Sequence, residues 1–211
     1  MSIRPGPGAH GYERALVQAG FSLVAGADEA GRGACAGPLV AAAVILDPEH
    51  PIEGLDDSKK LSVATRERLH DRIIESAIAW SVVFITNQEC DELGMQEADV
   101  QGLRRVLLRL EPRPSFVITD GFPVTGLDVP GLAIWKGDQV AACVSAASIL
   151  AKVTRDRWMI DQDRQWPGYG FAVHKGYATA AHQRALESLG PTPIHRMSYD
   201  NVRRAARVEP S

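Results

Sequence analysis

The 211-residue chain lacks both the long apolar segment of a membrane protein and the cysteine pattern of a secreted or zinc-binding one. Its longest unbroken apolar run, Leu39–Leu46, is far shorter than the ~20 residues a helix needs to cross a bilayer. The N-terminal sequence MSIRPGPGAHGYER contains no apolar core of a signal peptide, so we expect a cytoplasmic protein. The three cysteines are scattered and form no CxxC pair, which argues against a disulfide framework and a zinc finger.

Nucleotide-binding loops are also missing, since neither GxxxxGK[ST] nor a GxGxxG that opens a helix occurs. There is no internal repeat and no low-complexity block. The composition, 45% apolar and 23% charged, is that of an ordinary globular domain with room for a small helical appendage. One domain with a sizeable core therefore remains.

Charge is unevenly distributed along the chain, although the formal net charge is only −3. Residues 1–149 hold 13 Lys and Arg against 20 Asp and Glu, whereas residues 150–211 hold 10 against 6. An acidic body with a basic last third could hold metal ions in one place and phosphates in another. Chance is an equally good explanation of an excess this small.

Apolar patterning predicts five strands, at residues 21–27, 39–46, 80–85, 116–119 and 132–135. It also predicts four helices, at about 62–79 with Ser62 as N-cap, 96–110, 140–158 with one face of small residues, and from Thr179 to Gly190-Pro191. A Gly-rich bend at 31–38 joins the first two strands, which indicates an antiparallel pair. The order predicts a mixed α/β sheet flanked by helices, with a helical C-terminal region.

Acidic side chains follow three of the predicted strands: Asp28 and Glu29 after the first, Asp120 after the fourth and Asp138 after the fifth. If these ends are neighbours in the sheet, the four carboxylates converge and their pKa values rise unless a cation sits among them. Oxygen-only ligands favour Mg²⁺ or Mn²⁺. Two such ions ~3.5–4 Å apart would form the clamp used for in-line displacement at phosphorus. For any one of these residues, a solvated turn acid is the ordinary alternative.

Gly31 and Gly33 flank Arg32 directly after the first two acids. Glycines let a backbone approach a ligand closely and present its N–H groups. A tight hairpin that needs positive φ is the plainer explanation.

Six segments, taken in order over about residues 21–180, resemble bacterial ribonuclease HII, the type 2 ribonuclease H family. They are DEAGRGACAGPLVAAAVIL (28–46), DSKKL (57–61), TDG (119–121), KGD (136–138), SAASILAKVTRD (145–156) and HKGY (174–177). Any one of them could arise by chance, but the ordered set is highly specific.

The resemblance implies a ribonuclease H-like mixed sheet with a helical C-terminal part. We expect a catalytic domain at 21–165, a helical C-terminal region at 166–211 packed on it, and, from the Pro and Gly content of the N-terminus, a loose segment at 1–20. The resemblance further implies an enzyme that cuts RNA in RNA–DNA hybrids and cuts 5′ of single ribonucleotides in duplex DNA, leaving a 3′-hydroxyl and a 5′-phosphate. Asp28, Glu29, Asp120 and Asp138 would be the catalytic acids and would hold two Mg²⁺ or Mn²⁺ ions. The small size and the lack of a heptad pattern fit a monomer.

The resemblance also assigns residues to the substrate. Gly31, Arg32 and Gly33 would form the ribonucleotide-sensing loop, and Tyr177 would sense the RNA-to-DNA junction by packing on the neighbouring sugar. The 2′-hydroxyl that distinguishes RNA from DNA both donates and accepts hydrogen bonds, which suits a close backbone loop. Basic side chains could take the flanking phosphates, and we expect this of Lys59, Lys60, Lys152 and Arg155.

Some assignments stay open. Asp156 is a rival fourth acid, but its place late in a helix favours a structural ion pair. His174 could be a general acid, although a packing or phosphate role fits as well, and Asp57 and Asp128 are taken as loop residues. Met95–Ala98 stands where the family has an Asn-Ile pair, and Tyr199 replaces a Phe in the closing HRxSF segment.

Other classes of protein remain possible at this stage. Type 3 ribonuclease H has a long N-terminal domain and a different glycine signature, whereas ribonuclease H-like transposases, resolvases and exonucleases share the acids but not the Gly-Arg-Gly loop. The non-enzymatic alternative is a nucleic-acid-binding module on a degenerate nuclease fold. Clustered negative charge near phosphates gains nothing for binding alone, and this argues against the module.

Overall fold

A computed structural model describes residues 8, 10–56, 58 and 60–207 of the chain. The strands are β1 (Val24–Ala30), β2 (Leu39–Ile45), β3 (Ala79–Ile85), β4 (Phe116–Asp120) and β5 (Gly131–Ile134). The α-helices are α1 (Gly11–Gln18), α2 (Val63–Ser76), α3 (Asn87–Leu93), α4 (Met95–Leu108), α5 (Ala142–Gln165), α6 (Phe171–His174), α7 (Ala180–Leu189) and α8 (Asp200–Ala205), and η1 (Gly137–Gln139) is a 3-10 turn.

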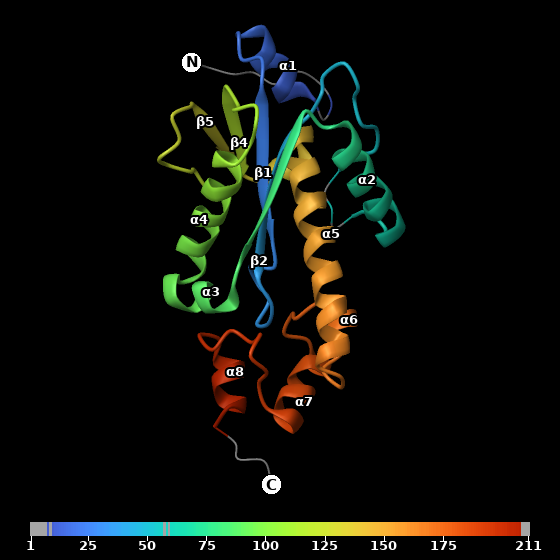
Figure 1. Cartoon of the computed structure of the whole chain (residues 1–211), viewed down its shortest axis with the longest axis vertical. Helices are drawn as coiled ribbons and strands as arrows, with labels where there is room; N and C mark the ends of the chain where they lie inside the picture. Colours follow the sequence, from blue (N-terminus) through green and yellow to red (C-terminus); the bar gives the residue numbers. More distant parts are fainter. Residues whose placement is uncertain (1–7, 9, 57, 59, 208–211) are drawn as a thin grey trace.

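The strands form one mixed sheet in the order β3-β2-β1-β4-β5. β1, β2 and β3 pair antiparallel, whereas β4 and β5 run parallel to β1. The expected antiparallel pair across the Gly-rich bend is confirmed, and so is the mixed sheet flanked by helices (Figure 1). Ser62 and Thr179 cap α2 and α7 as expected, since each side chain accepts a backbone N–H of the first turn.

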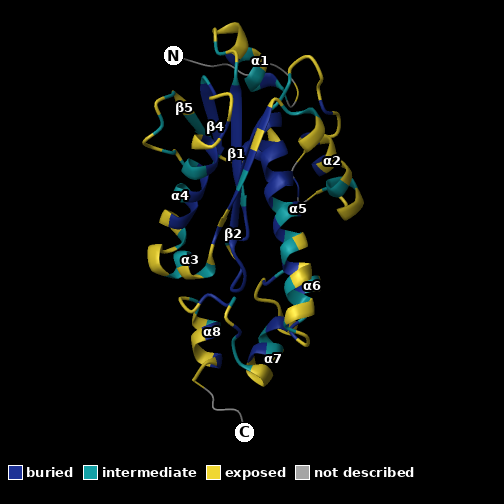
Figure 2. Ribbon diagram, in the orientation of Figure 1, coloured by how far each residue is buried: buried dark blue, intermediate teal, exposed yellow. Residues whose placement is uncertain are grey.

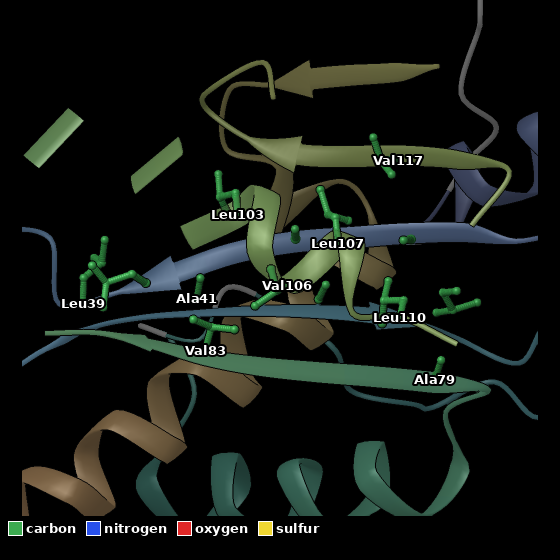
Figure 3. Close-up of a cluster of buried hydrophobic side chains, with 14 of the residues drawn as sticks. Leu39, Ala41, Ala79, Val83, Leu103, Val106, Leu107, Leu110 and Val117 are labelled. Atoms are coloured by element: carbon green, nitrogen blue, oxygen red, sulfur yellow. The ribbon is translucent and has the colours of Figure 1, made fainter. Parts of the chain in front are cut away.

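Helices cover both faces of the sheet. α3 and α4 lie on one face, and α2 and α5 on the other (Figure 1). Figure 3 shows the apolar cluster between α4 and the sheet, where Leu103, Val106 and Leu107 meet Ala41, Val83 and Val117. Burial follows these layers: β2, most of β1 and β4, and the inner faces of α4 and α5 are buried, whereas the outer faces of the helices are exposed (Figure 2). The edge strands differ, since β5 is only half-buried and β3 alternates buried with more exposed residues. The sheet is therefore a rigid frame for the residues at its ends.

The first half of α5 packs unusually close to the sheet because both surfaces are built from small residues. Ala142, Ala146 and Ala147 are buried in the helix, and a Cβ placed on Gly26 of β1 would lie 2.2 Å from the carbonyl carbon of Cys143. The expected face of small residues is thus confirmed. Close packing fixes the start of α5 against β1 and β4, where the predicted acids lie.

The first strand begins and ends later than expected. It spans Val24–Ala30, not 21–27, so Asp28 and Glu29 lie inside β1 and do not follow it. The alternation of apolar residues misleads here because the strand continues through polar residues at the edge of a site. Successive side chains of a strand point to opposite faces, so the two neighbouring acids diverge.

The expectation that residues 1–20 are loose is wrong for Gly11–Gln18, which form α1. Leu16 is fully buried in a cluster with Val24, Phe116 and Val144. The Glu13 carboxylate accepts the backbone N–H of Cys143 at 2.7 Å, and it thereby caps the start of α5, whose own N-cap residue, Ala141, has no side chain to do so.

The C-terminal region lies beyond one end of the sheet (Figure 1) and pairs with the loop after β1. Isolated bridges join Ala34 to Tyr177 and Ala36 to His195. This region therefore closes the Gly-rich bend from the outside. Among the described residues, no helix combines the length and apolarity that a membrane crossing requires.

Candidate active site

Three aspartates meet where β1, β4 and η1 come together. Asp28 and Asp120 follow a register pair of the parallel strands, Ala27 and Thr119, so they lie side by side. Asp138 lies in η1, directly after β5. One carboxylate oxygen from each of these three aspartates lies within 4.8 Å of the others. The sheet topology thus brings together three of the four acids that the sequence singled out.

Hydrogen bonds fix the orientation of these carboxylates. Asp28 Oδ1 accepts the backbone N–H of Glu29, and Asp120 Oδ1 accepts that of Gly137, each at 2.8 Å. Asp28 also interacts with the hydroxyl of Ser148 on α5, which in turn lies 3.0 Å from the hydroxyl of Ser58. These two serines were quoted only as parts of motifs, and nothing in the sequence marked them as neighbours of the cluster.

The cluster is electrostatically unfavourable without a cation. Burial raises the pKa of Asp28 well above its ordinary value, and the negative charges of Glu29 and Asp120 raise it further. The donors are all oxygens, they are close together, and their mutual repulsion would be relieved by a divalent ion. These residues fit a site for a hard cation such as Mg²⁺ or Mn²⁺.

Glu29 lies beside this cluster, where a fifth acid, Asp99 of α4, approaches it. Burial raises the pKa of Glu29 to about 8, with contributions from the charges of Asp99 and Asp120. Asp99 is fully buried, its pKa is raised by burial to about 6, and the nearby Arg32 guanidinium opposes that rise. The sequence reasoning missed Asp99. The signal that could have found it is an acid on the buried stripe of a predicted helix, aligned with Leu103 and Val106.

The Gly-rich bend at 31–38 is held by two buried arginines. Arg155 of α5 donates to the carbonyls of Ala36, Pro38 and Lys175 at 2.9–3.0 Å. Arg196 donates to the carbonyls of Gly37 and Arg32 at 3.0 and 3.1 Å. Both arginines are fully buried, and they fix the carbonyl groups of the loop in place.

A cavity of about 480 Å³ joins the aspartates to this loop. Its lining includes Asp28, Glu29, Asp120, the whole Gly31–Gly33 segment, Lys152 and Tyr177. Gly31 has φ +95°, and a Cβ there would lie 2.0 Å from Arg155 Nε, so only glycine fits. Tyr177 is 37% exposed and faces Gly33 across the mouth of the cavity, with a ring carbon 3.9 Å from the place of a Cβ on Gly33.

The predicted phosphate-binding residues have different surroundings. Lys152 lines the cavity and pairs with Asp156 at 2.8 Å, which agrees with the structural ion pair expected of Asp156. Lys60 is exposed and lies 3.5 Å from Asp56. Arg155 is not where we expected it, because its buried guanidinium is committed to backbone carbonyls and faces no solvent. Lys59 and Asp57 lie outside the described residues, and Asp128 is exposed, as expected of a loop residue.

Three histidines support the segment that carries Tyr177. His174 is buried, its Nε2 lies 2.8 Å from the Tyr169 carbonyl, and its Nδ1 accepts the N–H of Gly176. These contacts support the packing role and leave neither ring nitrogen for proton transfer. His182 and His195 were not anticipated. Each is buried among aromatic rings, and burial lowers the pKa of each to about 4.

A mixed sheet that places three aspartates on and beside neighbouring parallel strands, next to a glycine loop, defines a ribonuclease H-like nuclease. The ribonuclease HII family model matches residues 25–202, and the chain belongs to that family. It is 64% identical over 203 residues to the ribonuclease HII of Cutibacterium acnes, covering 95% of this chain and 100% of that one. It is 57% identical over 211 residues to that of a Nocardioides species, covering 99% and 88%.

Solved structures agree with this assignment. The ribonuclease H2 of Pyrococcus horikoshii superposes with a TM-score of 0.78 at 30% identity, covering 87% of this chain and 97% of that chain. The chain is therefore a type 2 ribonuclease H with the ribonuclease H-like fold, as the six sequence segments indicated.

Proposed function

We propose that this enzyme hydrolyses the RNA strand of RNA–DNA hybrids and also cuts 5′ of a single ribonucleotide in duplex DNA, leaving a 3′-hydroxyl and a 5′-phosphate. The observation that carries the proposal is the shared cavity, in which Asp28 and Asp120 of the three-aspartate cluster and the Gly31–Gly33 loop line one space. Chemistry at a phosphate and recognition of the adjoining sugar can then occur on the same nucleotide.

Asp28, Glu29, Asp120 and Asp138 would hold two Mg²⁺ or Mn²⁺ ions. Bound ions of this kind supply an activated water and a stabilised leaving oxygen. The chain contributes the orientation of the carboxylates through the hydrogen bonds of Asp28 and Asp120. The close packing of α5 on β1 keeps this end of the cavity rigid, which favours catalysis because little reorganisation is needed.

The substrate is selected by its sugar. A Cβ on Gly33 would meet only a Tyr177 ring carbon, at 3.9 Å, so the backbone of the loop is accessible and can approach the 2′-hydroxyl of a ribonucleotide. Tyr177, on the opposite side, would pack against the next sugar. Lys152, Lys60 and Lys59 would contact phosphates and position the duplex without reading its sequence. For Arg155 we propose an indirect role, in which it shapes the loop and does not bind a phosphate.

The experiment is cleavage of a labelled DNA duplex with one embedded ribonucleotide, with Mg²⁺, with Mn²⁺ or with EDTA, beside an all-DNA duplex. The expected result is one metal-dependent nick 5′ of the ribonucleotide. The rate of this cleavage should fall at least about a hundredfold in Asp28→Asn and should be unchanged in Glu97→Gln. Glu97 is the matched control because its exposed carboxylate contacts only Gln101 among the described residues.

Two other outcomes would change the proposal. Cleavage of a long hybrid without cleavage at a single ribonucleotide would remove the junction role of Tyr177. Binding of either substrate without cleavage, with both metals, would favour the binding module. We also propose that the enzyme acts as a monomer in the cytoplasm, which sedimentation at assay concentrations and fractionation of cells would test.

A further inference from the structure

Asp99 is a fully buried carboxylate with one cation beside it. It projects from α4, and its two oxygens are closed off from solvent and lie near the carboxyl group of Glu29. The Arg32 Nε atom lies 3.5 Å from its Oδ2. Burying an ionised carboxylate is costly unless it is paired, so the pairing with Arg32 compensates for the burial of Asp99.

Arg32 is fixed at both its backbone and its side chain. Its carbonyl accepts the Tyr199 hydroxyl at 2.7 Å and the Arg196 guanidinium at 3.1 Å. Its guanidinium carbon lies 4.5 Å from the centre of the Phe122 ring. Phe122 offers a flat surface and Asp99 a charge, and together they define where the guanidinium lies at the edge of the cavity.

We propose that Asp99 is a positioning residue that acts through Arg32 to hold the Gly31–Gly33 loop ready for a ribonucleotide. The inference rests on the proposed function, since it assigns the loop to the substrate sugar. α4 covers the face of the sheet opposite to α5 (Figure 1), so Asp99 ties Arg32 to the α4 layer, while Arg155 of α5 holds the Ala36 carbonyl further along the same bend. Without the negative charge of Asp99, the Arg32 side chain keeps its contact with Phe122 and its attraction to Glu29, but loses the charge nearest to its Nε atom.

The test is a double-mutant cycle with Asp99→Asn, Arg32→Ala and the double variant, assayed on a duplex with one ribonucleotide. Asp99→Asn keeps the size of the side chain and removes its charge. We expect it to raise KM about five- to tenfold with kcat changed less than about threefold, the range that contacting residues show. In the Arg32→Ala background, Asp99→Asn should add almost nothing. Glu97→Gln, on the same helix, should match the wild type.

Two further measurements do not depend on cleavage. Affinity for the ribonucleotide duplex, measured by fluorescence anisotropy in EDTA, should fall by the same factor in Asp99→Asn. The Arg32 Nε–H signal, followed by NMR in the protein without metal or substrate, should be resolved in the wild type and should broaden or shift in the variant. If Asp99→Asn does not fold, Arg32→Gln should reproduce the predicted rise in KM.

Additive effects of the two substitutions would overturn the proposal, because they would show that Asp99 does not act through Arg32. A loss of Mn²⁺ affinity in Asp99→Asn with an unchanged Arg32 signal would also overturn it, by making Asp99 a metal ligand. If the wild type cuts neither substrate, the proposed function fails. The Arg32 signal would still decide whether Asp99 holds Arg32.

Discussion

The Nε2 atoms of His182 and His195 lie 3.0 Å apart in a pocket closed to solvent. The backbone N–H of Thr192 donates to His195 Nδ1 at 2.8 Å, so the proton of neutral His195 is on Nε2 and is donated to His182. The proton of His182 is then on Nδ1, 3.0 Å from the carbonyl of Tyr177. One directional series of hydrogen bonds thus runs, within the C-terminal region, from the backbone N–H of Thr192 through both histidines to the carbonyl of Tyr177.

The two buried histidines of this hydrogen-bond series predict a loss of stability in acid. Both histidines have a pKa of about 4 in the folded protein and of about 6.5 when unfolded, so the unfolded chain binds more protons between these values. The free energy of unfolding should therefore fall as pH decreases from about 6.5 to 4, by up to ~1.4 kcal/mol per pH unit for each histidine. Urea melts across this range, on the wild type and on His195→Gln, measure the effect. An unchanged slope in the variant would contradict it.

Glu29 predicts the opposite trend at higher pH. Its pKa is about 8 in the folded protein and near 4.5 when unfolded, so the folded state binds the extra proton between these values. In the metal-free protein this residue lowers stability as pH rises from 4.5 to 8. Glu29→Gln should be more stable than the wild type at pH 8, by on the order of 1 kcal/mol or more. Chemical denaturation in EDTA at pH 5 and pH 8 tests this, and equal differences at both pH values would refute it.

The three-aspartate cluster predicts that metal binding stabilises the protein and releases protons. Mg²⁺ or Mn²⁺ bound only by the folded state should raise Tm, and the rise should continue with the logarithm of metal concentration above the Kd. Because burial raises the pKa of Asp28 well above its usual value, binding of a metal ion should displace protons from this carboxyl group. Calorimetry in two buffers of different ionisation enthalpy measures this release. Asp120→Asn should weaken both the rise in Tm and the proton release, whereas Glu97→Gln should weaken neither. If the two variants behave alike, the ions bind elsewhere.

Gly31 and Gly33 predict different consequences of the same substitution. Gly31→Ala places a Cβ against Arg155 at φ +95° and should cost at least about 2 kcal/mol of stability and most of the cleavage activity. In Gly33→Ala the new Cβ makes only an ordinary contact with Tyr177, at 3.9 Å, and should change stability by less than about 0.5 kcal/mol. Any fall in cleavage by Gly33→Ala then reports a blocked approach to the sugar. Thermal melts beside the single-ribonucleotide assay separate the two cases, and equal melting would show that Gly31 tolerates a side chain.

Local pattern predicted much of this architecture. The five strands, the caps at Ser62 and Thr179 and the small face of α5 all follow from residues close together in the sequence. The end of β1 was misplaced because Asp28 and Glu29 interrupt the apolar pattern, although the strand pairing continues through Ala30.

What sequence could not predict is contact between distant elements. Asp99 meets Arg32 only because α4 folds onto the sheet, and Arg155 reaches the carbonyls of Ala36 and Pro38 only because α5 packs so closely. A basic residue in a nuclease-like motif indicates phosphate binding, yet burial decides which groups it contacts. Only the tertiary structure shows that Arg155 donates to backbone carbonyls.

The two arginines that hold the loop are shielded from dissolved ions, whereas Lys60 and Lys152 are reached by them. Salt weakens duplex association by competing for phosphate charges, but it has little effect on buried charge pairs and hydrogen bonds. Ionic strength should therefore alter how tightly this enzyme holds any duplex without altering its preference for a ribonucleotide over a deoxyribonucleotide. Under the proposed function, overall affinity and sugar discrimination would in this sense be set independently, by the surface and by the interior of the protein.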